Sequence, residues 1–108
     1  MNLERVLPAI TSLVVQALDP DEVVLFGSVA KGTASSHSDV DLLVIGRFAG
    51  ARHRRGAELR GLLDRYPLRF DLHLLTRDEE QKELARPQSW LATLREHARV
   101  LYVRAPRS

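Results

Sequence analysis

The chain has 108 residues, 44% hydrophobic and 28% charged, with a formal net charge of +2. These totals are typical of one globular domain over residues 1–108 and exclude a largely disordered chain, and the charge is too small to indicate nucleic-acid binding by itself. The absence of cysteine excludes disulfides, thiolate catalysis and cysteine-ligated zinc.

Nothing in the sequence indicates a membrane segment. No run of about twenty apolar residues occurs, and the N-terminus carries Glu4 and Arg5 in place of an apolar signal-peptide core. We therefore expect a cytoplasmic protein.

The first expected element is an amphipathic helix over residues 3–18. Pro8 lacks an N–H group, so the helix begins near Leu7 or bends at Pro8. The Asp19-Pro20 pair ends it. Its apolar residues follow the helical spacing of three and four positions and should face a sheet: Leu3, Val6, Leu7, Ile10, Leu13, Val14, Ala17 and Leu18.

A buried strand over residues 23–26 leads into Gly27 and Ser28, which indicate a tight turn and the start of a short helix. Backbone amides at such a turn attract phosphate oxygens, and Gly27 lets a ligand approach closely. Lys31, about one turn further on, would add positive charge, although a solvated helix lysine is nearly as good an interpretation.

After a polar loop over residues 33–38, Asp39 and Asp41 open an apolar strand that ends at residue 45. Residues two apart on a strand point to the same face, so both carboxylates should project together. Two close carboxylates are unfavourable without a cation between them, and Mg²⁺ is the natural one.

A loop at residues 46–50 and a helix over residues 51–66 should follow, and arginines gather in this region. A solvated helix face is the favoured interpretation, and a basic rim for a nucleotide or an acidic partner is the alternative. The arginines concerned are Arg47, Arg52, Arg54, Arg55 and Arg60.

The next apolar alternation predicts a strand over residues 68–75, with Arg69, Asp71 and His73 on one face. An aspartate within an apolar strand is unfavourable unless it is paired or binds a cation. Asp71 is therefore expected to meet either an arginine or a metal ion.

The C-terminal part should contain a helix over residues 76–86 with a Thr76 cap, a helix carrying Trp90, and a strand over residues 100–103, followed by a frayed basic tail. Trp90, Leu91 and residues 101–103 either close the core, which we favour, or form a partner surface.

The pattern of strand, Gly27-Ser28 turn, ten intervening residues and Asp39-Val40-Asp41 resembles the minimal nucleotidyltransferases of the DNA polymerase β superfamily. The resemblance implies an α/β (α+β) palm fold with a small mixed sheet of about four strands flanked by helices. It also implies transfer of a nucleotide with release of pyrophosphate, supported by two Mg²⁺ ions about 3.5–4 Å apart.

By this resemblance, Asp39 and Asp41 would bridge both metal ions, and Asp71 would bind the ion beside the nucleophile. Gly27, Ser28 and Lys31 would hold the triphosphate of ATP. Apart from the resemblance, His37 lies in the loop before Asp39 and could contact the nucleotide, and His73 should share a face with Asp71, although incidental polar side chains are the favoured interpretation for both.

Many minimal members of this family resemble the antitoxin half of a module whose toxin is an all-helical HEPN RNase. The resemblance implies transfer of AMP from ATP to a tyrosine of that toxin. The weak net charge speaks mildly against nucleic acid as a substrate, and no membrane is expected as a partner. The alternatives are a non-catalytic module that neutralises its partner by contact, and nucleotidyl transfer to a small molecule or an RNA end.

Overall fold

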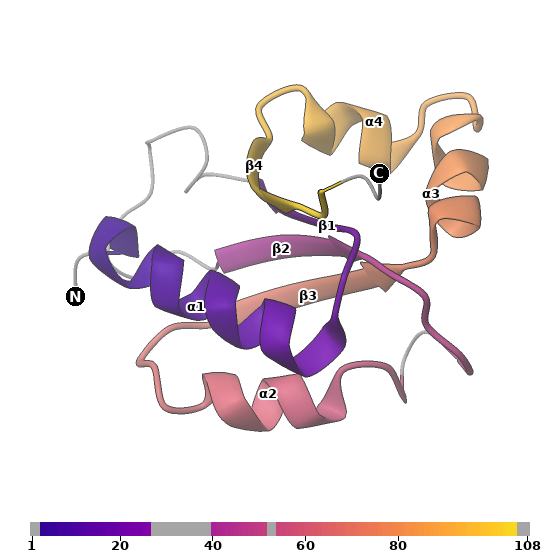
Figure 1. Ribbon diagram of the computed structural model, residues 1–108. Helices are drawn as coiled ribbons and strands as arrows, with labels where there is room; N and C mark the ends of the chain where they lie inside the picture. Colours follow the sequence, from indigo (N-terminus) through magenta and orange to yellow (C-terminus); the bar gives the residue numbers. More distant parts are fainter. Residues whose placement is uncertain (1–2, 27–39, 52–53, 106–108) are drawn as a thin grey trace.

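The computed structural model describes residues 3–26, 40–51 and 54–105. Four helices and four strands occur within these residues, coloured along the chain in Figure 1. In order they are α1 (Leu3–Leu18), β1 (Glu22–Phe26), β2 (Val40–Ile45), α2 (Ala57–Leu63), β3 (Phe70–Leu75), α3 (Arg77–Leu84), α4 (Trp90–Arg95) and β4 (Arg99–Val103).

The strands form one mixed sheet in the order β3-β2-β1-β4. β1 runs antiparallel to both β2 and β4, whereas β2 and β3 are parallel. The predicted mixed α and β fold with a four-stranded sheet is therefore confirmed. β2 lies inside the sheet, and its residues beyond Asp41 are buried, which suits a strand covered on both faces.

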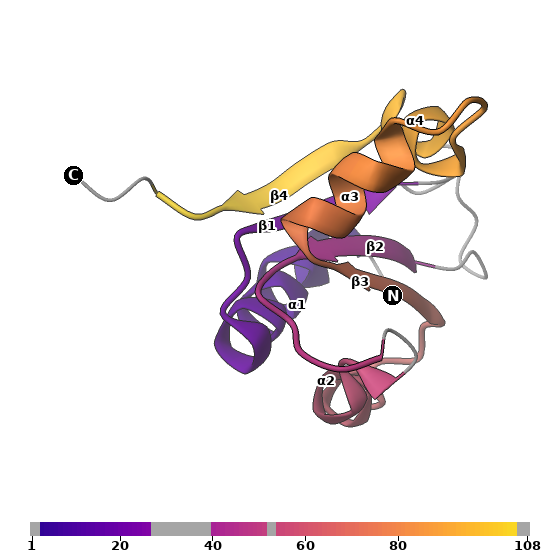
Figure 2. The same cartoon turned by 90° about the vertical axis from the view of Figure 1, so that its right-hand side faces the viewer.

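Different helices cover the two faces of the sheet. Alternate strand residues such as Leu25, Leu42 and Leu72 pack with Ile10 of α1 and Leu59 of α2. The intervening residues pack against α4, and Figure 2 shows α3 and α4 on one side of the sheet with α1 and α2 on the other. The period of two along each strand thus assigns each side chain to one of two cores.

α1 is longer than a helix that begins near Leu7, which was one of the two alternatives that Pro8 left open. The helix begins at Leu3 and continues through Pro8 to Leu18, so the expected start near Leu7 is wrong. Pro8 is the sixth residue of the helix, beyond the first four positions whose N–H groups have no helical partner, so the helix continues through it with one backbone hydrogen bond fewer. Asp19 then adopts a left-handed φ of 46° and ends the helix, as the Asp19-Pro20 pair predicted.

α2 is much shorter than the predicted helix over residues 51–66. It begins at Ala57, directly after Gly56, whose φ of 77° is left-handed and interrupts a right-handed helix. It ends at Leu63, four residues before Pro67. Leu59 and Leu63 are buried, so the predicted apolar side of the helix is present.

The C-terminal elements follow the prediction closely, with α3, α4 and β4 each where the sequence places them. The start of the basic tail is not frayed, however, because Arg104 donates to the Asp19 and Asp21 carboxylates at 2.7 and 3.2 Å. Within the described residues, no helix has the length and apolar character needed to span a membrane.

Candidate functional site

Asp41 and Asp71 are direct neighbours in the sheet. They are register partners on the parallel strands β2 and β3, which lie about 4.8 Å apart in a sheet. Register partners on adjacent strands project to the same face, and here it is the face that α3 and α4 cover. The structure therefore brings together the second and third carboxylates that the sequence proposed.

Asp71 is accessible to solvent, although it lies in an apolar strand. Its side chain is 61% exposed, and one carboxylate oxygen lies 3.5 Å from His73 Nε2. Asp71 is the second residue of an edge strand, so solvent reaches it at the open end of the sheet. Its place in an apolar strand thus carries little desolvation cost, and a ligand can reach it.

An aromatic row borders the two carboxylates. The His73 ring lies 5.6 Å from the Phe26 ring and 5.3 Å from the Trp90 ring. Phe26 is itself the register partner of Asp41 on β1. This row joins β1, β3 and α4 beside the carboxylates.

The remaining predicted site residues lie outside the described part of the chain. These are Gly27, Ser28, Lys31 and Asp39, together with His37. Their proposed contacts with phosphate, metal ion or nucleotide therefore remain predictions from the sequence.

The described carboxylates suit a hard divalent cation. Asp41 and Asp71 offer oxygen atoms from two rigid neighbouring strands, and oxygen is the donor that Mg²⁺ prefers. Among the described residues no group of three histidine or acidic side chains could hold a metal ion. The donor set fits a Mg²⁺ site for which these two strands supply part of the ligands.

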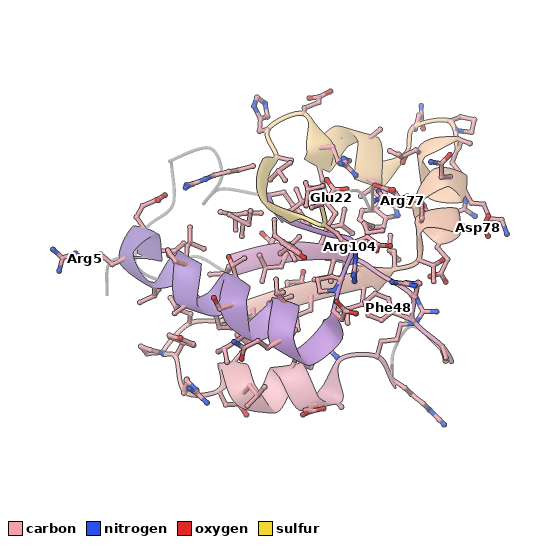
Figure 3. The ribbon with its side chains drawn as sticks, in the orientation of Figure 1. Arg5, Glu22, Phe48, Arg77, Asp78 and Arg104 are labelled. Carbon is pink, nitrogen blue, oxygen red and sulfur yellow. The ribbon has the colours of Figure 1, made fainter. Side chains whose placement is uncertain are left out.

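A network of four charged residues fixes α3 and α4 to β1. Arg77 donates to Glu22 and Glu80 at 3.1 and 2.7 Å, and Figure 3 shows Glu22 and Arg77 beside each other. Arg95 of α4 pairs with the same two carboxylates. Glu22 and Glu80 are buried, and α3 contributes no apolar residue to either core. The network therefore replaces apolar packing under α3.

The sequence did not predict this network, because Glu22 and Arg95 are far apart in the chain and follow no periodic pattern. The only local signal is the i, i+3 spacing of Arg77 and Glu80, which favours one ion pair on a helix.

Arg55, one of the arginines predicted to lie on a solvated helix face, is instead largely buried. The Arg55 side chain is only 8% exposed and donates to Glu79 at 2.6 Å. It also donates to the backbone carbonyl groups of Leu74 and Gly50, and its guanidinium lies over the Phe48 ring. Arg55 thus ties the loop before α2 to the start of α3. Three other arginines of this cluster, Arg47, Arg54 and Arg60, are exposed as predicted.

The pairing of Glu79 changes its ionisation. The hydrogen bond from Arg55 lowers the pKa of the Glu79 carboxyl group to about 2, and the Thr76 backbone N–H contributes in the same direction. Thr76 in turn accepts from the Glu79 backbone N–H, which completes a capping box at the start of α3.

The mixed four-stranded sheet and its helix-covered faces match the fold of nucleotidyltransferase domains. The nucleotidyltransferase domain family matches residues 6–101, and the chain belongs to this family. No curated protein matches the chain.

Three crystal structures have a similar fold at low sequence identity. A putative nucleotidyltransferase from Sulfolobus solfataricus is 20% identical, with 93% of this chain and 82% of that chain covered and a TM-score of 0.61. A toxin-antitoxin with AMP-PNP is also 20% identical, with coverages of 91% and 73% and a TM-score of 0.62. A further putative nucleotidyltransferase is 22% identical, with coverages of 88% and 96% and a TM-score of 0.52.

Proposed function

We propose that the protein is a Mg²⁺-dependent nucleotidyltransferase that transfers AMP from ATP to a hydroxyl group of a partner protein. The acceptor we propose is a tyrosine of a HEPN-type RNase toxin, which would make this chain the antitoxin. The observation that carries the proposal is the pairing of Asp41 with Asp71 at an accessible end of the sheet, in a chain that belongs to the nucleotidyltransferase family.

The toxin partner rests on a separate observation. One of the structures with a similar fold is a toxin-antitoxin with AMP-PNP. At 20% identity this likeness carries the fold alone, so the toxin and its tyrosine are part of the proposal and need their own test.

In the proposed reaction the acceptor oxygen bonds to the α-phosphorus of ATP, and the bond from that phosphorus to the bridging oxygen of the β-phosphate breaks. Pyrophosphate leaves, and the proton of the acceptor hydroxyl passes to water. Bound Mg²⁺ would neutralise the phosphate charge and lower the pKa of the hydroxyl. Asp39, Asp41 and Asp71 would hold the metal ions, and Asp71, on the edge strand, would lie nearest the acceptor.

The other site residues act on the triphosphate. Gly27 would allow the phosphates to approach the backbone, Ser28 would donate to them, and Lys31 would supply a positive charge. Positioning and charge neutralisation are the main contributions that a protein makes to phosphoryl and nucleotidyl transfer.

The test is incubation of the purified protein with ATP labelled on the α-phosphate, Mg²⁺ and the protein encoded by the adjacent reading frame. We expect label on a tyrosine of that protein, and no label with Asp41→Asn. Neutralisation of the partner that survives Asp41→Asn would instead support the non-catalytic module. Label on a small molecule or an RNA end would identify a different acceptor, and absence of any nucleotide binding would contradict the enzymatic proposal.

A further inference from the structure

Residues at the passage from α3 to α4 line a surface pocket. Figure 2 shows both helices on one side of the sheet, which by strand parity is the face that carries Asp41 and Asp71. The volume of the pocket is about 350 Å³. Neither the triphosphate nor the metal ligands proposed above require it. Its lining residues are Glu83, Arg86, Pro87, Gln88, Ser89 and Trp90.

Trp90 gives this pocket an accessible aromatic wall. Its side chain is 38% exposed although it is large and apolar, whereas the next residue, Leu91, is fully buried and fills the core. Trp90 is therefore not needed to close the core, which was the favoured interpretation from sequence. An indole that is partly open to solvent can stack on a flat heterocycle.

Glu83 gives the pocket a carboxylate group that is only partly paired by the described residues. The residue is 9% exposed, and Arg86 Nη1 approaches its Oε1 at 3.4 Å. Its Oε2 is buried and accepts no hydrogen bond from the described residues. A buried acceptor left unpaired is unfavourable, and an ionised carboxylate can only accept. A ligand that meets the Glu83 carboxylate must therefore present an N–H or O–H donor.

One side chain connects the pocket to the carboxylates. His73 contacts the Trp90 ring at 5.3 Å on one side and the Asp71 carboxylate at 3.5 Å on the other. A ligand with a flat ring in the pocket can therefore direct its remaining part toward Asp71. A nucleoside triphosphate has both parts, a flat heterocycle at one end and a metal-binding phosphate chain at the other.

We propose that this pocket binds the adenine base of ATP, with Trp90 stacking on the ring and the Glu83 carboxylate accepting from the 6-amino group. This inference rests on the proposed function, since it assigns the base of the same nucleotide. It makes Glu83 a specificity-determining residue, because hypoxanthine carries an oxygen acceptor where adenine carries the amino group. A carboxylate repels that oxygen, and sites built to bond a donor reject analogues that lack it.

The test uses the intrinsic fluorescence of Trp90, which is the only tryptophan in the chain. Titration of the intact protein with ATP and Mg²⁺ should change this fluorescence, and calorimetry should give the same affinity. We expect ITP to bind at least about tenfold more weakly than ATP. Glu83→Gln should bring the two affinities to within about threefold, because an amide can donate or accept.

Two substitutions at Trp90 separate stacking from folding. Trp90→Ala should weaken ATP binding by calorimetry about tenfold, while Trp90→Phe should retain it within about threefold, because the ring is kept. Lys82→Ala is the control, since its side chain is 78% exposed on α3 outside the pocket, and it should bind ATP like the unchanged protein.

Failure of this inference differs from failure of the proposed function. If ATP binds by calorimetry without changing Trp90 fluorescence, or if Glu83→Gln leaves the preference for ATP over ITP intact, the base lies elsewhere and the pocket assignment is wrong. If Trp90→Ala impairs capture of the partner protein but not ATP binding, Trp90 belongs to a protein interface and the assignment is again overturned. Absence of any nucleotide binding contradicts the proposed function itself.

Discussion

Asp41 and Asp71 offer a test of chemistry without a large effect on folding. Asp71→Asn keeps the shape of a side chain that is 61% exposed, so we expect a change in unfolding free energy within about 0.5 kcal/mol. The proposed metal site depends on its carboxylate charge, so transfer should fall by about 10²-fold or more. The rate of label transfer from ATP, beside urea unfolding curves, measures both effects.

The matched control is Asp78→Asn on α3. Its side chain is 76% exposed, projects away from the sheet in Figure 3 and pairs with Lys82 at the surface. Transfer should remain at the original rate. If Asp71→Asn also leaves the rate unchanged, Asp71 has no role in the chemistry, although the fold assignment still stands.

Glu79 predicts a pH dependence of stability. Its pKa in the folded chain is about 2, below the usual value of 4.5, so its pairing with Arg55 stabilises the protein above pH 4.5 and is lost as the pH falls toward 2. Because the side chain is partly exposed, we expect Glu79→Gln to cost about 1–2 kcal/mol at pH 7. Urea unfolding of both proteins should give a difference that narrows between pH 4.5 and 2. A constant difference across that range would contradict the ionic origin.

At the scale of the elements, two glycines beside and within α2 have opposite roles. Gly56 has a left-handed φ of 77°, and an added Cβ would lie 2.8 Å from Leu74 Cδ2, so Gly56→Ala should destabilise the protein by about 1–2 kcal/mol. Gly61 lies inside the helix with open space around it, so Gly61→Ala should stabilise by about 0.5–1 kcal/mol. Changes of the same sign in thermal unfolding would contradict the observed start of α2.

The buried network predicts that α3 depends on charge. Glu80→Gln removes the carboxylate that Arg77 and Arg95 share, and breaking a buried pair leaves charge uncompensated, so we expect a loss of about 2–3 kcal/mol. Asp78→Asn on the same helix removes only an exposed pair, which should change stability by less than about 0.5 kcal/mol. Equal effects of the two substitutions on denaturant midpoints would show that the network does not hold α3 in place.

These elements differ in how far the sequence could predict them. The strands were predictable because apolar residues alternate with period two, and that parity also assigned Asp71 to its face. The cap of α3 was predictable because Thr76 and Glu79 have a local spacing. The start of α2 was not, since it depends on the φ of Gly56, and neither was the exposure of Asp71, which depends on β3 being an edge strand. The attachment of α3 depends on long-range ion pairs, which leave no local pattern.

At the scale of the whole molecule, ligand binding and folding are linked. Asp41 and Asp71 lie on neighbouring strands that join only when the sheet forms, so Mg²⁺-ATP should bind the folded chain alone. At a hundredfold excess over its dissociation constant, such a ligand adds about 2.7 kcal/mol, which in a domain of this size raises Tm by roughly 10 °C. A thermal unfolding series with ATP, with and without Mg²⁺, measures this shift.

Removing Mg²⁺, or replacing an aspartate that is proposed to bind it, should abolish most of the rise in Tm that ATP causes. EDTA and Asp41→Asn should each reduce the rise in Tm to about 2 °C or less, because the phosphates then lack the cation that joins them to the sheet. Asp78→Asn should show the full rise, since its carboxylate is exposed on α3 away from the site. A full rise that persists in EDTA and in Asp41→Asn would mean that ATP binds without these carboxylates. The chain would then hold nucleotide as a binding module, and contact with its partner would become the better account of its function.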